Sequence, residues 1–361
     1  MALTKREKLV LFGLVKWPNL NDTELSERLD LKRPTITSIR KRLHESGYYD
    51  FVLIPDLAKI GCELITAFHS DFNPLTDFSI RKKYAILVRE HFRDYFFVAG
   101  TDKERAMMAA SKNFTELREQ VEYSERLYWR QGFLTEEGNT YAFFPLALTR
   151  VFPFFDYSNL LYNQFGLNLG IKRDPLDSEF EKVDQPDLKH KEKMIFYALV
   201  KYPTLNDLGI AEKLSISRQT VSSARKKFFE DGLLLQCCIP NIKKLGFELL
   251  VFDHSVFNPN FTLENRLERL WDLLSLPTSS GWYDSKILDF STNLESVTLS
   301  VFQSYTEFRK YYGEYLSFYK KEGFLLKESA IRTLPIKDLT PLSGIRFDLL
   351  IKKFFGIEQE I

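Results

Sequence analysis

Residues 5–49 read KREKLVLFGLVKWPNLNDTELSERLDLKRPTITSIRKRLHESGYY, and residues 190–234 read HKEKMIFYALVKYPTLNDLGIAEKLSISRQTVSSARKKFFEDGLL. The two stretches align without a gap, and the match continues to Pro74 and Pro259 with roughly 29 identities over about 70 positions. Chance does not produce such agreement. Each half of the chain is therefore expected to hold one copy of the same module.

Each copy has the pattern of a helix-turn-helix. In the first copy apolar residues recur at helical spacing until Pro18, and Asn21 or Asp22 can cap a second helix. A third helix begins near Pro34, and Gly47 ends it before a short strand that can form a wing. The second copy agrees at each point, so the sequence predicts two winged helices.

A strand-like run follows each winged helix, at residues 62–70 and 247–255, and an asparagine-proline turn and a charged helix come next. Later segments complete the order strand, helix, strand, strand, helix, strand, which is typical of a ferredoxin-like domain. The predicted fold class is therefore α+β. It is a tandem duplication in which each half is a winged helix-turn-helix domain followed by a ferredoxin-like α/β domain.

The repeat and the composition together predict the domain boundaries. A segment with prolines, many charged residues and few apolar ones separates the halves, and it is expected to be a solvated linker. The predicted parts are the first winged helix at residues 1–56, the first α/β domain at 57–170, the linker at 171–188, the second winged helix at 189–241 and the second α/β domain at 242–361.

The composition of the 361 residues, 44% hydrophobic and 27% charged, is that of an ordinary soluble globular protein. The apolar stretch after Lys5 resembles a secretory signal, but its counterpart after Lys193 lies in the middle of the chain, so both are expected to be core helices. Cys62, Cys237 and Cys238 lack metal-ligand spacing. We expect a cytoplasmic protein that binds no metal or cofactor and does not enter a membrane.

The formal net charge is only +1, so any contact with DNA has to come from local basic patches. Residues 32–42 contain five basic side chains and no acidic one, and residues 217–227 contain four and none. These stretches are the predicted third helices, and a helix-turn-helix places that helix in the major groove. A single basic helix could be a solvated surface, but the same bias in both copies favours DNA binding.

Position and chemistry suggest different roles for these side chains. Arg33 and Arg218 can make bidentate contacts to guanine and Gln219 can contact adenine, whereas Arg40 and Arg225 are assigned mainly to phosphates. The predicted DNA-binding residues are Lys32, Arg33, Thr35, Thr37, Ser38, Arg40, Lys41, Ser217, Arg218, Gln219, Thr220, Ser222, Arg225 and Lys226. Since the copies differ at several of these positions, the expected target is an imperfect inverted repeat with half-sites about 10 base pairs, or a multiple, apart.

The stretch LNDTELSERLDLKRPTITSIRKRLHESGYY, with its continuation IP…LAKIG and the equivalents in the second copy, runs straight into a β-strand. In this the chain resembles the Lrp/AsnC family of prokaryotic transcription regulators. The resemblance implies a sequence-specific transcriptional regulator of double-stranded DNA that acts as an intramolecular pseudo-dimer and is not an enzyme. It also allows a further homodimer and a small-molecule effector at the α/β domains. No effector is named, because the family's Gly-x-x-Asp turn is matched only by Gly100 and Asp102 at a shorter spacing.

Two other functions remain open beside the regulator. His69 and His254 occupy the same strand end in both copies. A structural role is one interpretation, but some proteins with an Lrp-like fold are siroheme decarboxylases made of paired or fused modules that use histidines near a tetrapyrrole. A winged helix can also become a scaffold that binds other proteins. The basic third helices favour the regulator over both.

Overall fold

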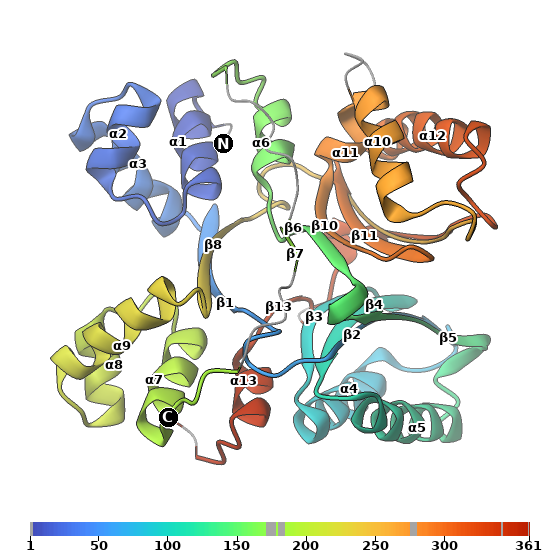
Figure 1. Ribbon diagram of the computed structural model, residues 1–361, viewed down its shortest axis with the longest axis horizontal. Helices are drawn as coiled ribbons and strands as arrows, with labels where there is room; N and C mark the ends of the chain where they lie inside the picture. Colours follow the sequence, from blue (N-terminus) through green and yellow to red (C-terminus); the bar gives the residue numbers. More distant parts are fainter. Residues whose placement is uncertain (1–2, 171–177, 180–184, 275–279, 341, 360) are drawn as a thin grey trace. The chain divides into compact units, whose positions relative to one another are not determined.

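The computed structural model describes residues 3–170, 178–179, 185–274, 280–340, 342–359 and 361. The first winged helix consists of α1 (Lys5–Lys16), α2 (Asp22–Leu29), α3 (Arg33–Glu45) and the strand β1 (Tyr49–Pro55) (Figure 1). Thr4 begins α1 through a capping box and Asn21 caps α2, so both helices start where a polar side chain accepts from the first turn. The apolar stripes of the three helices bury Leu14, Leu25 and Ile36 in one core.

The second winged helix repeats this plan with α7 (His190–Lys201), α8 (Asp207–Leu214), α9 (Arg218–Glu230) and β8 (Leu234–Pro240). Asn206 caps α8 and Ser217 caps α9, as predicted. The residues that follow the third helices, Gly47 and Gly232, have φ angles of 63° and 62°. Because this left-handed conformation is accessible mainly to glycine, both helices end at the predicted residue.

The first α/β domain contains β2 (Leu64–Phe72), α4 (Phe78–Phe92), β3 (Tyr95–Gly100), β4 (Glu104–Ser111), α5 (Phe114–Arg130) and β5 (Leu134–Pro145). Its sheet has the antiparallel order β3-β4-β2-β5, extended at β3 by the short strand β13 (Gly344–Ile345). Phe68 and Met107 share a buried cluster with Tyr128 of α5, so this side of the sheet faces the helices. Side chains alternate along a strand, and His69 and Ala106 therefore lie on the opposite side.

The second α/β domain contains β9 (Leu249–Val256), α10 (Leu263–Leu274), α11 (Ser280–Asp284), β10 (Lys286–Ser291), β11 (Glu295–Phe302), α12 (Tyr305–Lys321) and β12 (Ala330–Pro335). Its strands follow the equivalent order β12-β9-β11-β10, and the short strands β6 and β7 extend the sheet beyond β10. Val251 and Phe302 lie in a buried cluster with Tyr315 of α12. His254 again belongs to the side of the sheet that faces away from the helices.

The last strand of each half does not join the sheet of its own half. After the 3-10 helix η1 (Leu146–Leu148), β6 (Arg150–Phe154) pairs with β10 of the second half, and α6 (Ser158–Gln164) packs against α1. After η2 (Ile336–Asp338), β13 pairs with β3 of the first half, and α13 (Asp348–Phe354) packs against α7. The rings of Phe12 and Tyr162 are 5.6 Å apart at one of these helix contacts, and those of Phe196 and Phe355 are 5.2 Å apart at the other.

The exchange divides the chain into two units, each assembled from three segments. One comprises the described residues of 1–51, 150–179 and 236–337, and the other those of 52–149, 180–235 and 338–361. Each unit therefore combines the winged helix of one half with the α/β domain of the other half.

Most of the predicted linker, at 171–177 and 180–184, lies outside the described residues. Within it, Ser178–Glu179 form β7, which pairs with β6, and Leu188 is buried. None of the helices in the described part of the chain is both long and apolar enough to span a bilayer.

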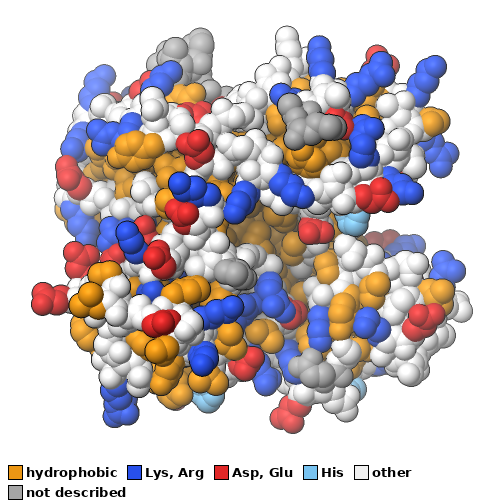
Figure 2. Space-filling model, turned by 180° about the vertical axis from the view of Figure 1, so that it is seen from behind, with side chains coloured by type: hydrophobic (Ala, Val, Ile, Leu, Met, Phe, Trp, Pro, Cys, Tyr) orange, Lys and Arg blue, Asp and Glu red, His pale blue; other side chains and the backbone are white. Residues whose placement is uncertain are grey.

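The predicted α+β class with two copies of each domain is confirmed by these elements. Lys and Arg side chains are interspersed with Asp and Glu over the face shown in Figure 2, in keeping with the net charge of +1.

Candidate nucleic-acid interface and histidine clusters

The predicted DNA-binding residues all lie on the third helices or at their caps. Lys32 and Ser217 are the N-cap residues of α3 and α9, and of the two only Ser217 makes a side-chain cap bond, in which its Oγ accepts from the amide of Thr220. The exposed members of the set are Lys32, Arg33, Thr37, Ser38 and Lys41 in the first copy and Ser217, Arg218, Gln219, Ser222 and Lys226 in the second. The half-buried members are Thr35, Arg40, Thr220 and Arg225.

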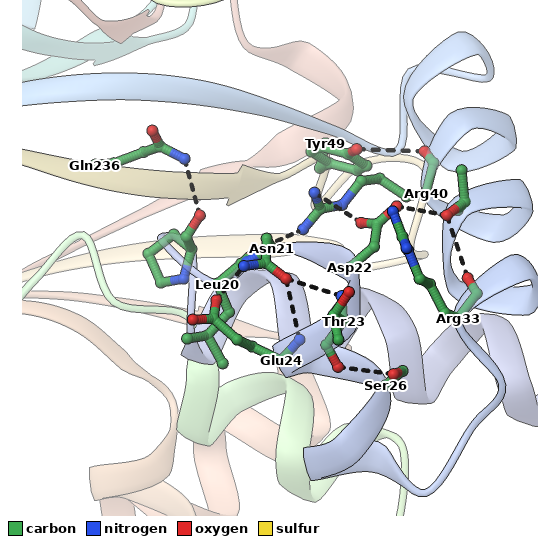
Figure 3. A network of polar contacts seen from close by, with 12 residues as sticks. Leu20, Asn21, Asp22, Thr23, Glu24, Ser26, Arg33, Arg40, Tyr49 and Gln236 are labelled. Atoms are coloured by element: carbon green, nitrogen blue, oxygen red, sulfur yellow. Dashed lines mark hydrogen bonds and ion pairs between the residues drawn. The ribbon is translucent and has the colours of Figure 1, made fainter.

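The side chain of Arg40 bonds to residues of its own winged helix (Figure 3). Its Nη1 lies 2.9 Å from Oδ1 of Asp22, and its Nη2 donates to the carbonyl of Leu20 over 3.0 Å. The other carboxylate oxygen of Asp22 accepts from the hydroxyl of Thr37 over 2.6 Å. Charge-assisted bonds of this kind join α3 to the start of α2, so Arg40 acts as a link between two helices.

The second copy repeats this link with the same chemistry. Nε of Arg225 lies 2.7 Å from Oδ1 of Asp207, and its Nη2 donates to the carbonyl of Leu205 over 3.0 Å. The recurrence of an arginine at this position in both copies is therefore accounted for by contacts within each winged helix.

A second cation of each third helix is paired with α1 or α7. Arg42 Nη2 lies 2.8 Å from Glu7 Oε1, and Lys227 Nζ lies 2.9 Å from Glu192 Oε1. Hydrogen bonds from Thr4 and the nearby Arg42 lower the pKa of Glu7, and the Lys227 bond lowers the pKa of Glu192. Both carboxylates are thus held in the charged form that the cations require.

The remaining cations form the candidate interface. Lys41 and Lys226 are exposed and approach Glu45 and Glu230 of their own helices at 3.8 and 3.6 Å, which stabilises a helix only slightly. Lys32, Arg33 and Arg218 form no ion pair among the residues that the structure describes. The acidic partners of these cations lie on other helices, outside residues 32–42 and 217–227. Their presence in both copies, as Asp22/Asp207 and Glu7/Glu192, was a sequence signal that could have revealed the ion pairs.

A different cluster surrounds His69 on the side of its sheet that faces away from α4 and α5. Nδ1 of this buried histidine lies 3.6 Å from Oδ2 of Asp71, and its Nε2 lies 3.4 Å from Oε2 of Glu104. One ligand atom from each residue lies within 4.8 Å of the others, an arrangement that could hold a divalent cation. Glu104 was missed in the sequence because it lies on a separate strand.

The equivalent cluster of the second α/β domain keeps only part of this set. Nε2 of His254 lies 2.9 Å from Oε2 of Glu295, and both glutamates begin equivalent strands. Val256 stands where the first copy has Asp71. The histidine-glutamate pair is therefore common to both copies, whereas the three-residue cluster belongs to the first.

Comparison of the sequence with known protein families found no match, and comparison with curated proteins found none either. Among solved structures, the siroheme decarboxylase NirDL is 11% identical with a TM-score of 0.52, and the match covers 97% of this chain and 98% of that one. The same enzyme in complex with an iron-uroporphyrin III analogue has a TM-score of 0.50 and 11% identity, with 99% and 100% covered. An AsnC family transcriptional regulator from Agrobacterium tumefaciens covers 45% of this chain and 98% of its own, at 15% identity and a TM-score of 0.33.

At 11% identity the likeness to NirDL shows a shared fold. It nevertheless contradicts the prediction that the chain is not an enzyme, because the protein that matches almost the whole chain is one. A fused pair of winged-helix and α/β modules therefore does not by itself indicate a regulator.

Proposed function

We propose that the chain is an enzyme of the siroheme decarboxylase type, which removes carboxylate groups from a tetrapyrrole. The observation that carries this proposal is the likeness to NirDL, which extends over almost the full length of both chains. A match confined to one winged helix and one α/β domain would support only a shared fold. A match that extends over both fused modules supports the same function for the pair.

The histidine-glutamate pairs supply the chemistry that such a reaction needs. When a carboxylate leaves as CO2, the carbon–carbon bond breaks and the electron pair left on the carbon takes up a proton, so a proton donor is required but no oxidant or reductant. Histidine is the side chain most often used for this task. A carboxylate hydrogen-bonded to the ring fixes its orientation and tautomer, as Glu295 does for His254 at 2.9 Å, and Glu104 lies 3.4 Å from the same ring nitrogen of His69. We assign the two histidines as candidate proton donors.

The contacts of the third helices also support this proposal. The two arginines that recurred most clearly, Arg40 and Arg225, link helices within their own domains. Their recurrence is no longer an argument for DNA, so the basic third helices favour the regulator less than their composition indicated.

The test is to titrate the purified protein with siroheme, follow the Soret absorbance, and then analyse the incubated mixture by mass spectrometry. We expect saturable binding and a product lighter by the mass of CO2. His69→Gln and His254→Gln should lower the rate of product formation, whereas His44→Gln, on the exposed side of α3, should not. Neither binding nor product would contradict the proposal, and binding without loss of CO2 would contradict its enzymatic part.

DNA binding is a second candidate function, favoured by one observation. Lys32, Arg33 and Arg218 lie exposed at the start of α3 or α9 and form no ion pair in the described part of the chain. Residues at this end of a recognition helix contact base edges. Of the predicted DNA-binding residues, the candidate contacts to bases are therefore these three cations together with Ser217 and Gln219.

Fluorescence anisotropy with a duplex from upstream of the gene and a scrambled duplex, at several salt concentrations, tests this candidate. Specific binding should weaken steeply with salt and should be reduced in the Arg33→Ala and Arg218→Ala double variant. Equal affinity of the variant and the parent protein would rule out this interface.

A further inference from the structure

A cavity of about 50 Å³ lies in the first α/β domain, between the helix-facing side of the sheet and the helices α4 and α5. Aromatic rings form much of its wall, among them those of Tyr95, Tyr128 and Tyr141. A space of about 10–15 Å³ by this measure holds one water molecule, so the cavity accommodates a ligand of only a few non-hydrogen atoms.

Polar atoms without a protein partner line this cavity. They are Oγ1 of Thr66, Nε of Arg89, Nε of Arg105, Oε1 of Gln120, Oγ of Ser124 and Oδ1 of Asn139, each buried and unpaired within the described residues. Thr66 is fully buried and Gln120 is 3% exposed. A buried polar atom without a partner destabilises the fold, so a ligand or ordered water that pairs with these atoms is favoured.

The hydrogen bonds around the cavity set the polarity of its lining. Nε2 of Gln120 donates to Asp94 over 2.8 Å, and Nδ2 of Asn139 donates to Glu125 over 2.7 Å. The amide oxygens of both residues are therefore left as acceptors. Arg105 donates to the hydroxyl of Tyr128 over 3.3 Å and has no carboxylate partner among the described residues. The cavity thus offers cationic donors from Arg89 and Arg105 together with neutral acceptors.

The second α/β domain has different side chains at the positions that line this cavity. Where α5 has Gln120 and Ser124, the aligned positions of α12 have Tyr311 and Tyr315. Tyr315 is buried, with its ring 5.0 Å from that of Trp282 and 4.2 Å from that of Tyr319. Thr66 and Arg105 are likewise replaced, by Val251 and Ser296. Small or polar residues in one copy therefore stand where bulkier or less polar ones stand in the other.

We propose that the cavity binds a short-chain hydroxycarboxylate, the size of glycolate or lactate. The guanidinium of Arg105 would face the carboxylate, because a planar array of N–H donors matches the two carboxylate oxygens. The hydroxyl would donate to the amide oxygen of Gln120 or Asn139. Apart from Leu342, its lining belongs to the first α/β domain, and the proposal does not depend on tetrapyrrole chemistry.

Ligand-observed saturation-transfer NMR on the full chain tests the site, with glycolate and lactate as probes and with acetate and ethylene glycol as probes that lack one of the two groups. We expect saturable binding of the hydroxycarboxylates in the millimolar range or tighter, weaker binding of acetate and none of the neutral diol. Arg105→Ser should weaken binding at least about tenfold, since it removes a charged hydrogen bond.

The copy comparison provides matched variants. Ser124→Tyr places the side chain of the second copy in the cavity and should abolish binding, whereas Tyr315→Ser changes the aligned position of the second domain and should leave binding unchanged. Thr66→Val, also taken from the second copy, decides the matter if Ser124→Tyr fails to fold, as judged by near-UV circular dichroism, and it should weaken binding. No saturable binding by the parent protein, or equal binding by a folded Ser124→Tyr protein, would overturn the proposal.

Discussion

The two α/β domains share one strand order but fill the layer between sheet and helices differently. In the first, Gln120 and Ser124 border a cavity with unpaired polar atoms. In the second, Tyr315 packs among aromatic rings, and a buried ion pair of 2.7 Å joins Lys286 to Asp289. Those charges satisfy each other, and the unpaired polar atoms of the second domain, among them Nε1 of Trp282 and Oγ1 of Thr298, have an aromatic core beside them, whereas those of the first domain border the cavity.

The two winged helices show the opposite relation. Arg40 and Arg225 make the same pair of contacts in their own domains, with distances that differ by no more than a few tenths of an ångström. After duplication, residues that hold each domain together stay the same in both copies. Agreement between the copies at these arginines is therefore accounted for by structure, and positions at which the copies differ in character are a second guide to function beside the recurring histidine-glutamate pairs.

The largest expected effect concerns the packing of the aromatic layer. Phe308 of α12 is buried against Phe302 and Tyr312, and its counterpart in α5 is Leu117, which borders the cavity. Phe308→Ala should lower the free energy of unfolding by about 3–5 kcal/mol, and Leu117→Ala by only about 2 kcal/mol, because fewer contacts are lost beside an existing hollow. Denaturant titration followed by tryptophan fluorescence measures both. A cost for Leu117→Ala as large as that for Phe308→Ala would remove the contrast between the layers.

A second difference between the domains should appear as a pH dependence. Asp94 is fully buried beside Gln120, and the aligned residue of the second copy is the neutral Ser285. Burial raises the pKa of Asp94 to about 7, although Lys353 opposes part of that rise. A carboxyl with a raised pKa holds its proton more firmly in the folded state than in the unfolded state. Its contribution to stability is therefore greatest in acid and is lost as the pH rises toward 7.

Asp94→Asn should remove this loss. Between about pH 5 and pH 8, the unfolding free energy of the variant relative to the parent should rise by on the order of 3 kcal/mol. Urea titrations at a series of pH values measure the difference, with Ser285→Asn as the matched control in the second domain. A constant difference across that range would mean that Asp94 does not change its protonation there.

The winged helices should respond alike to loss of their link. Arg40→Met and Arg225→Met should each lower the free energy of unfolding by about 1–2 kcal/mol, because each leaves one carboxylate oxygen and one carbonyl without the arginine donor. Asp22→Asn combined with Arg40→Met should cost less than the sum of the single changes, since both remove the same interaction. Strictly additive costs would show that Asp22 and Arg40 do not stabilise the domain through a shared interaction. A cost in one copy only would show that the two winged helices are not equivalent.

Much of the fold could be predicted because it depends on local signals that occur twice. Asn21, Ser217 and the two helix-ending glycines set the bounds of the helix-turn-helix, and strand-like runs followed by asparagine-proline turns indicated the α/β domains. The exchange of β6 and β13 was not predictable in this way. Both halves present the same strand pattern, so a closing strand matches the sheet of either half, and only the tertiary structure selects the partner.

The candidate sites were less predictable, for two physical reasons. The sequence of α3 shows only its own basic residues, whereas Asp22 and Glu7, which pair with two of them, lie on neighbouring helices. The cavity depends on side-chain volume at positions such as Ser124, and a serine on a helix face is usually solvated rather than turned toward a hollow interior. The duplication contained both signals, as repeated acids and as a serine replaced by tyrosine.

The smallest expected effect on stability separates the cations that hold the fold from those that do not. Arg33 and Arg218 are the first residues of α3 and α9, where the positive end of the helix dipole makes a cation unfavourable. The Arg33→Ala and Arg218→Ala double variant should therefore keep the free energy of unfolding within about 0.5 kcal/mol of the parent, or raise it slightly, in contrast to Arg40→Met. The same denaturant titration measures it. If stability is unchanged, the fold does not account for the two arginines at these positions, which is the result that the proposed contact with DNA bases requires. A loss above about 1 kcal/mol would instead place them with Arg40 among the links of the winged helix.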